Sequence, residues 1–121
     1  MRPVEFIGPS REDLRAFPEK VRQDVGHALF QVQRGGTPDA VAPLHGFGAG
    51  VLEIRTTGVA GTYRTVYTVA LPSAIYVLHA FQKKSPRGIA TARVDQELIR
   101  SRLAWARRVD AERRKEEEGH G

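Results

Sequence analysis

Residues 51–84 read VLEIRTTGVAGTYRTVYTVALPSAIYVLHAFQKK and hold three runs of β-favouring residues separated by two short turns. In order along the chain, these runs and turns are residues 51–57, 58–61, 62–70, 71–73 and 74–84. Valine, isoleucine, threonine, tyrosine and phenylalanine are typical of strands, whereas glycine and proline mark turns. Because such short turns connect strands that run in opposite directions, this stretch predicts a three-stranded antiparallel meander.

The residues before the meander predict a strand and a helical hairpin. Val4–Ile7 is rich in β formers, and Ser10 with an acidic residue three positions later resembles a capping box that opens a helix over residues 11–17. In the next segment valine and leucine recur at helical spacing until Gly35-Gly36, a pair suited to end a helix. Residues 37–50 are loop by composition.

After the meander, apolar residues at helical spacing predict a last helix from about residue 90 to residue 113. Residues 114–121 carry charges of both signs and almost nothing apolar, so we expect a frayed tail there. No repeat or linker interrupts the chain, which indicates one domain over residues 1–121. The order of strand, two helices, three strands and helix predicts an α+β fold, with the helices packed on one face of the sheet.

Composition limits the function classes. The chain has 121 residues and no cysteine, which excludes disulfides, thiolate metal sites and cysteine nucleophiles. Its four histidines are scattered without metal-ligand spacing, and we expect no metal and no cofactor. Nineteen basic residues against 14 acidic ones fit an anionic partner, although solubility alone is an alternative reason. No apolar stretch has the length of a membrane span or a signal-peptide core, so we expect a soluble cytoplasmic protein without a membrane partner.

The two turns predict which side chains meet across the strands. A first turn centred between residues 59 and 60 places Arg55 opposite Arg64. A second turn centred between residues 72 and 73 places Arg64 opposite Phe81, residue 66 opposite His79 and Tyr67 opposite Leu78.

Alternation along the strands then divides the sheet into two faces. The face expected under the helices carries Leu52, Ile54, Tyr67, Val69, Tyr76, Leu78 and Ala80. The other face carries Glu53, Arg55, Arg64, Val66, His79, Phe81 and Lys83. Neighbouring cations repel unless an anion lies among them, and arginine and lysine match a phosphate group well. His79 could move a proton near neutral pH, and aromatic rings could stack on a base.

Structural interpretations of the same residues remain open. Arg55 and Arg64 could form a surface network with Glu53 and nearby acids, and His79 could be a core histidine with its polar contacts satisfied. Lys83 and its neighbour Lys84 could protect the end of a strand from aggregation.

Four motifs in and near the meander resemble a known family. They are Leu44-His45-Gly46, Glu53-Ile54-Arg55, Tyr63-Arg64-Thr65-Val66-Tyr67, and Leu78-His79-Ala80-Phe81-Gln82-Lys83-Lys84 followed by Pro86. This pattern resembles the phage-derived HigB-like toxins of the RelE/ParE superfamily over about residues 43–100, although Thr65 stands where an aliphatic residue is common. The resemblance implies a RelE-like fold and a toxin of a type II toxin–antitoxin system.

The resemblance further implies a ribosome-dependent mRNA endonuclease that uses no metal or nucleotide cofactor. Its partners would be a helix-turn-helix, HigA-like antitoxin, mRNA and the ribosome. The residues carried over as catalytic are Arg55, Arg64, His79 and Lys83, and those carried over as substrate-binding are Lys84, Phe81, Tyr67 and Arg87. We expect the RNA 2′-hydroxyl to attack the adjacent phosphorus, with His79 or Lys83 as the base. A gyrase-inhibiting toxin of the same fold and a non-catalytic, phage-related interaction module remain alternatives.

Overall fold

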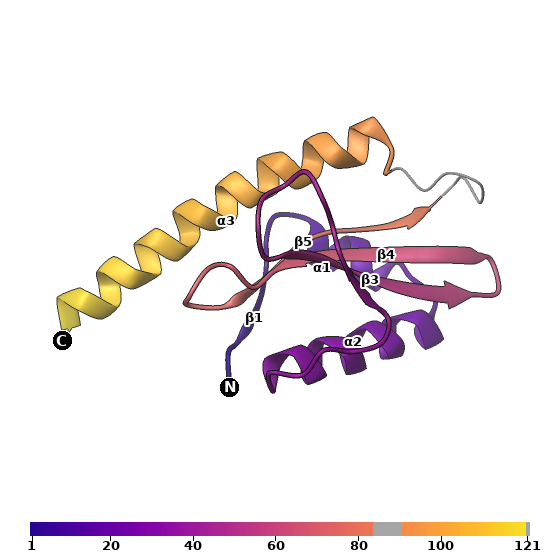
Figure 1. The fold of residues 1–121 in the computed structure, drawn as a ribbon, viewed down its shortest axis with the longest axis horizontal. Helices are drawn as coiled ribbons and strands as arrows, with labels where there is room; N and C mark the ends of the chain where they lie inside the picture. The colour runs from indigo at the N-terminus through magenta and orange to yellow at the C-terminus, as the bar shows by residue number, and fades with distance from the viewer. Residues whose placement is uncertain (84–90, 121) are drawn as a thin grey trace.

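The protein is described by a computed structural model that covers residues 1–83 and 91–120, with the side chain of residue 120 left out (Figure 1). The elements along the chain are β1 (Val4–Phe6), α1 (Ser10–Arg15), α2 (Glu19–Gln33), β2 (Val41–Pro43), β3 (Val51–Gly58), β4 (Gly61–Thr68), β5 (Ile75–Lys83) and α3 (Arg93–His120). The α+β fold class and the meander of β3, β4 and β5 are confirmed. Within the described ranges, no helix has both the length and the apolar character needed to span a bilayer.

The five strands form one sheet in the order β1-β5-β4-β3-β2. The N-terminal strand β1 pairs with β5 in parallel, and the other pairs are antiparallel. Strand β2 lies within the segment that the sequence predicts as loop. It has three residues, Val41–Pro43, and pairs through them with the first half of β3. Because β2 has only three residues, includes a proline and is flanked by turn-forming residues, the sequence does not reveal it as a strand.

The strand registers confirm most of the predicted cross-strand pairs. Arg55 lies opposite Arg64, which in turn lies opposite Phe81, and Val66 lies opposite His79. The predicted partner of Tyr67 is wrong, because an irregularity after Val66 shifts the register and places Tyr67 opposite Val77. An extra residue in β5 therefore changes the faces of the residues that precede it.

Helices cover both faces of the sheet, so the predicted one-sided arrangement is wrong. Helix α2 packs on one face together with Ile54 and Tyr67, and α3 packs on the other with Val66 and Leu78. Figure 1 shows α2 and α3 on opposite sides of the strands. Tyr76 and Leu78, predicted on the face of Ala80, instead belong to the α3 side because of the irregularity in β5.

The boundaries of the helical hairpin follow local backbone chemistry. Helix α2 ends where Gly35 adopts a φ of +82°, a conformation that glycine tolerates best. The predicted capping box at Ser10 is wrong, because Pro9 holds the N-cap position and no side chain caps the helix. The Ser10 hydroxyl instead donates a hydrogen bond to the buried carbonyl of Val77, 3.1 Å away, and so ties α1 to β5.

Candidate functional site

Three cationic side chains lie close together on the α3 side of the sheet. Arg55 and Arg64 are directly opposite on β3 and β4, and Lys83 lies near the end of β5, opposite Thr62. The Arg55 side chain is 50% exposed and the Arg64 side chain 12% exposed. We call Arg55, Arg64 and Lys83, with the acid Glu53 between the two arginines, the cationic cluster. It lies beyond the part of the sheet that α3 covers with Ile99 and Leu103.

Glu53 is the shared counter-charge of the two arginines. One carboxylate oxygen, Oε1, accepts a hydrogen bond from Nε of Arg55 at 2.8 Å and from Nη1 of Arg64 at 2.5 Å. The Glu53 side chain is 3% exposed, so this ion pair is screened less than a surface pair. Three cations and one anion leave the cluster with a net charge of +2 when Lys83 is protonated. From the sequence we expect Glu53 only as one acid of a surface network, whereas it lies buried at the centre of the cluster.

The environment of Lys83 makes its ammonium group easier to deprotonate than that of an ordinary lysine. Partial burial and the nearby Arg64 guanidinium lower its pKa below the ordinary lysine value, and Arg55 acts in the same direction. Glu53 opposes the shift but does not outweigh it. A lysine with a lowered pKa is a better proton acceptor near neutral pH than an ordinary surface lysine.

His79 is buried in a polar network beneath α3. Its Nδ1 accepts a hydrogen bond from Nη1 of Arg102 at 2.8 Å, and its Nε2 donates to Oδ1 of Asp95 at 2.7 Å. Arg102 also donates to the carbonyl of Leu78 and lies 3.5 Å from Oδ2 of Asp13. Both ring nitrogens are therefore occupied by protein groups, and the ring is 5% exposed. This arrangement fits the core-histidine interpretation better than the catalytic one.

The predicted substrate-binding residues have different positions. Phe81 is partly exposed beside the cluster, and its ring stacks on His79 with centroids 4.9 Å apart. Tyr67 is 1% exposed in the core beneath α2, where burial raises its pKa to about 12, so its ring is not available on the cationic face. Lys84 and Arg87 lie outside the described residues.

A groove of about 420 Å³ opens next to the cationic cluster. Its walls are the loop of residues 43–47, Glu53 and Arg55 of β3, and Gln96 and Arg100 of α3, with Thr91 ahead of the helix. We call this the α3 groove. The guanidinium of Arg100 lies over the Phe47 ring, 5.1 Å from its centroid. Arg100 and Phe47 are not predictable from the sequence, because no pattern in either segment indicates that a loop and a later helix meet.

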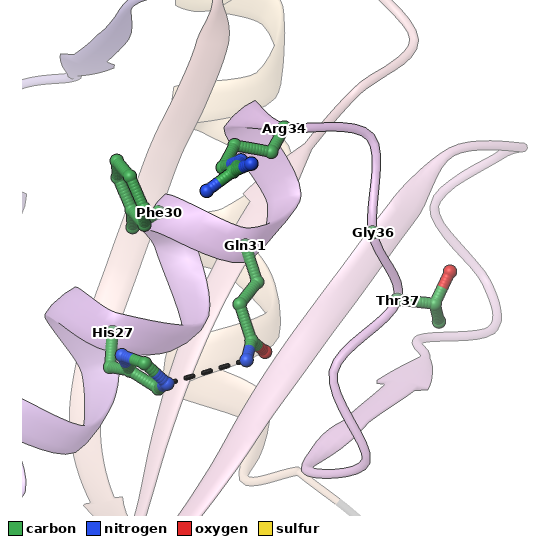
Figure 2. A pocket seen from close by; sticks show the side chains of 6 residues that line it. All are labelled: His27, Phe30, Gln31, Arg34, Gly36 and Thr37. Carbon is green, nitrogen blue, oxygen red and sulfur yellow. Dashed lines mark hydrogen bonds between the residues drawn. The ribbon is translucent and has the colours of Figure 1, made fainter.

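A second hollow, of about 470 Å³, lies along the C-terminal half of α2. Figure 2 shows His27, Phe30 and Gln31 on the helix, Arg34 at its C-cap and Thr37 on the segment that follows it. The His27 ring and the Gln31 amide are hydrogen-bonded at 3.3 Å. Because α2 covers the other face of the sheet, this hollow is separate from the cationic cluster.

Among residues 1–83 and 91–120, no group of three or more histidine, cysteine, aspartate or glutamate side chains is placed to bind a metal ion. The side chains of the cationic cluster offer two kinds of chemistry. Two guanidinium groups can hold a phosphate through charge-assisted hydrogen bonds, and an amine of lowered pKa can accept a proton.

Comparison with solved structures identifies the class of fold. Isolated E. coli RelE toxin superposes with a TM-score of 0.54 at 17% identity, over 84% of this chain and 98% of that one. A double arginine-to-alanine mutant of E. coli RelE in the free state gives a TM-score of 0.56, also at 17% identity, over 70% of this chain and 86% of that one. A RelBE2 toxin–antitoxin complex from Mycobacterium tuberculosis gives 0.48 at 22% identity, over 68% of this chain and 98% of that one. The fold is that of the RelE toxins, as the sequence motifs predict.

The family follows from the sequence itself. Residues 12–104 match the model of the family described as phage derived protein Gp49-like (DUF891), and the chain belongs to this family. The expected relationship to the RelE superfamily is thereby confirmed. None of the curated proteins matches the sequence significantly.

Proposed function

We propose that the protein is the toxin of a type II toxin–antitoxin system and acts as an mRNA endonuclease on the ribosome, in the cytoplasm. The observation that carries this proposal is the cationic cluster, in which Arg55, Arg64 and Lys83 gather on the α3 side of the sheet. Family membership and the RelE fold support the toxin class. The partner we propose is a helix-turn-helix antitoxin, which would hold the toxin inactive.

In the proposed reaction the 2′ oxygen of a ribose attacks the adjacent phosphorus. The bond from phosphorus to the 5′ oxygen breaks and leaves a 2′,3′-cyclic phosphate. The departing 5′ oxygen takes a proton from water and becomes a free 5′-hydroxyl. Lys83, as the neutral amine, accepts the 2′ proton, which its lowered pKa makes easier. Arg55 and Arg64 bind the phosphate oxygens and stabilise the negative charge that grows in the transition state.

The remaining candidate residues have supporting roles in this proposal. His79 positions β5 and α3 through its bonds to Asp95 and Arg102, and we do not assign it as the base. The Phe81 ring next to the cluster offers a surface for stacking. Lys84 and Arg87 follow β5 in the sequence and remain proposed contacts for the RNA backbone.

The experiment is controlled expression in bacteria of the wild type, Arg64→Ala and Lys83→Ala. We expect the wild type to stop growth and both variants to permit it, because losing one positioned catalytic group lowers a rate by about 10²–10⁴-fold. The matched control is Arg108→Ala, which removes an exposed arginine on α3 outside the cluster and should remain toxic.

Translation and DNA-damage reporters distinguish the alternatives in the same cells. Arrested translation supports the endonuclease, whereas a DNA-damage response with intact translation would indicate a gyrase-inhibiting toxin. Harmless expression of the wild type would indicate an interaction module. If both cluster variants stop growth as strongly as the wild type, the cationic cluster is not the active site.

A further inference from the structure

The α3 groove lies directly beside the cationic cluster. Glu53 and Arg55 belong to both, so the groove begins where the cluster would hold a phosphate. In a single strand, each phosphate joins two sugars, and each sugar carries a base. A phosphate held by Arg55 would therefore place an adjoining base near this opening. Its volume of about 420 Å³ is within the range of ligand-binding pockets in proteins.

We propose that the α3 groove binds the base of a nucleotide adjoining the scissile phosphate, stacked on the guanidinium of Arg100. This inference rests on the proposed function and adds a base-binding subsite formed outside the meander. The subsite joins three segments that are far apart in the sequence: the loop of residues 43–47, β3 and α3.

Arg100 has the geometry of a stacking platform. Its guanidinium lies over the Phe47 ring, 5.1 Å from the centroid, and Phe47 is 8% exposed, which makes it a fixed support. Arg100 itself is exposed and lines the groove. Because Arg100 is exposed while Phe47 supports it from the protein, a second flat group can approach its guanidinium from the groove. Guanidinium planes stack on nucleobases as well as on aromatic side chains.

The charge of Arg100 is available to an RNA ligand. Among the described residues, no carboxylate lies within ion-pair distance of it, in contrast to Arg93, which pairs with Glu97 at 3.3 Å on the same helix. A stacked base would thus add cation–π attraction to the phosphate contacts of the cluster. Gln96 and the exposed His45 bring polar groups to the rim, where they can contact the edges of a base.

The test measures binding rather than cleavage. An RNA dinucleotide has one phosphate flanked by two bases, and it cannot react by 2′ attack when the sugar before the phosphate is 2′-deoxy. Its affinity for the full chain is measured by NMR titration at low salt, with the flanking base present or replaced by an abasic sugar on either side. The proteins are wild type, Arg100→Ala, the control Arg108→Ala, and Arg64→Ala.

For the wild type and Arg108→Ala, we expect removal of one flanking base to weaken binding roughly tenfold, as for the loss of one stacked base. For Arg100→Ala, the same removal should change little, because the stacking partner is already lost. Comparing the effect of base removal in the wild type and in Arg100→Ala separates the contribution of stacking from that of the positive charge, which Arg100→Ala also removes.

Two results would overturn the inference, and they differ in what they say of the proposed function. If binding depends on Arg64 but Arg100→Ala shows the same abasic effect as the wild type, there is no base subsite at Arg100 and the endonuclease proposal stands. If the wild type does not bind the dinucleotide and the groove resonances respond instead to an acidic peptide, both proposals fail and the groove is a protein-binding site.

Discussion

Glu53 is the residue that makes the cationic cluster compatible with a stable fold. Arg55 and Arg64 lie directly opposite each other, and like charges in that arrangement destabilise a pair of strands. Oε1 of the buried Glu53 accepts a hydrogen bond from each arginine, and its negative charge offsets this repulsion. The cluster still keeps an excess of positive charge for a phosphate.

We therefore expect Glu53→Gln to lower the free energy of unfolding by about 2–4 kcal/mol, because the variant leaves two close cations without a buried counter-charge. Urea denaturation measures this loss. Glu97→Gln is the control, since its pair with Arg93 is exposed and should contribute at most about 0.5 kcal/mol. Equal losses in the two variants would show that Glu53 does not stabilise the cluster.

The lowered pKa of Lys83 predicts the direction of the pH dependence of cleavage. The neutral amine is the active form, so the rate should rise with pH and level off at a pH below the ordinary lysine value of 10.5. Glu53 raises the pKa of Lys83, so Glu53→Gln should move the midpoint to lower pH. A pH–rate profile of RNA cleavage under single-turnover conditions measures both midpoints. A profile that falls with rising pH would exclude Lys83 as the base.

At the scale of elements, the buried network around His79 joins α3 to β5 and α1. Asp95 and Arg102 reach the ring from successive parts of α3, and Asp13 approaches Arg102 from α1. These bonds hold the start of α3 in place, which in turn forms one wall of the α3 groove.

Asp95→Ala should lower stability by about 1–3 kcal/mol, because it leaves the Nε2–H of a buried histidine without an acceptor. Amide hydrogen exchange should speed up first in the opening turns of α3, whereas α2 should stay protected. Asp24→Ala, which breaks an exposed pair with Lys20, is the control and should change stability little. Unchanged exchange in α3 would contradict the anchoring role.

Among the elements, the register of the β3–β4 hairpin could be predicted from the sequence, whereas the irregularity in β5 and the α3 groove could not. The pairing of Arg55 with Arg64 was predictable because a short glycine-rich turn determines the register of its hairpin. The irregularity in β5 was not, because Ile75–Leu78 is apolar on both sides and lacks the alternation that would reveal a shift of face. The α3 groove was equally hidden, since Arg100 and Phe47 meet only through tertiary packing.

At the scale of the whole molecule, helices cover the sheet on both faces. Helix α3 crosses the sheet from the groove towards the turn between β4 and β5, where Asp110 accepts hydrogen bonds from the Tyr76 hydroxyl and the backbone of Ser73. Figure 1 shows the C-terminal part of α3 extending past the strands. The segment predicted to fray continues the helix, and residues 114–119 are exposed.

A chain that ends after Arg113 should have a free energy of unfolding within about 0.5 kcal/mol of that of the full chain, because the removed residues are exposed and bury little surface. A chain that ends after Ala106 loses the buried contacts of Asp110 and should be strongly destabilised. Thermal unfolding followed by circular dichroism compares the two truncations. Equal destabilisation would mean that the end of α3 stabilises the molecule despite its exposure.

The most direct test of the central claim is the chemistry of RNA ends in cells that express the protein. If the cationic cluster cleaves RNA by 2′ attack, the wild type produces new fragments that end in 2′,3′-cyclic phosphate and begin with 5′-hydroxyl, and Arg64→Ala produces none. Intact mRNA during growth arrest, or fragments that begin with a 5′-phosphate, would contradict it.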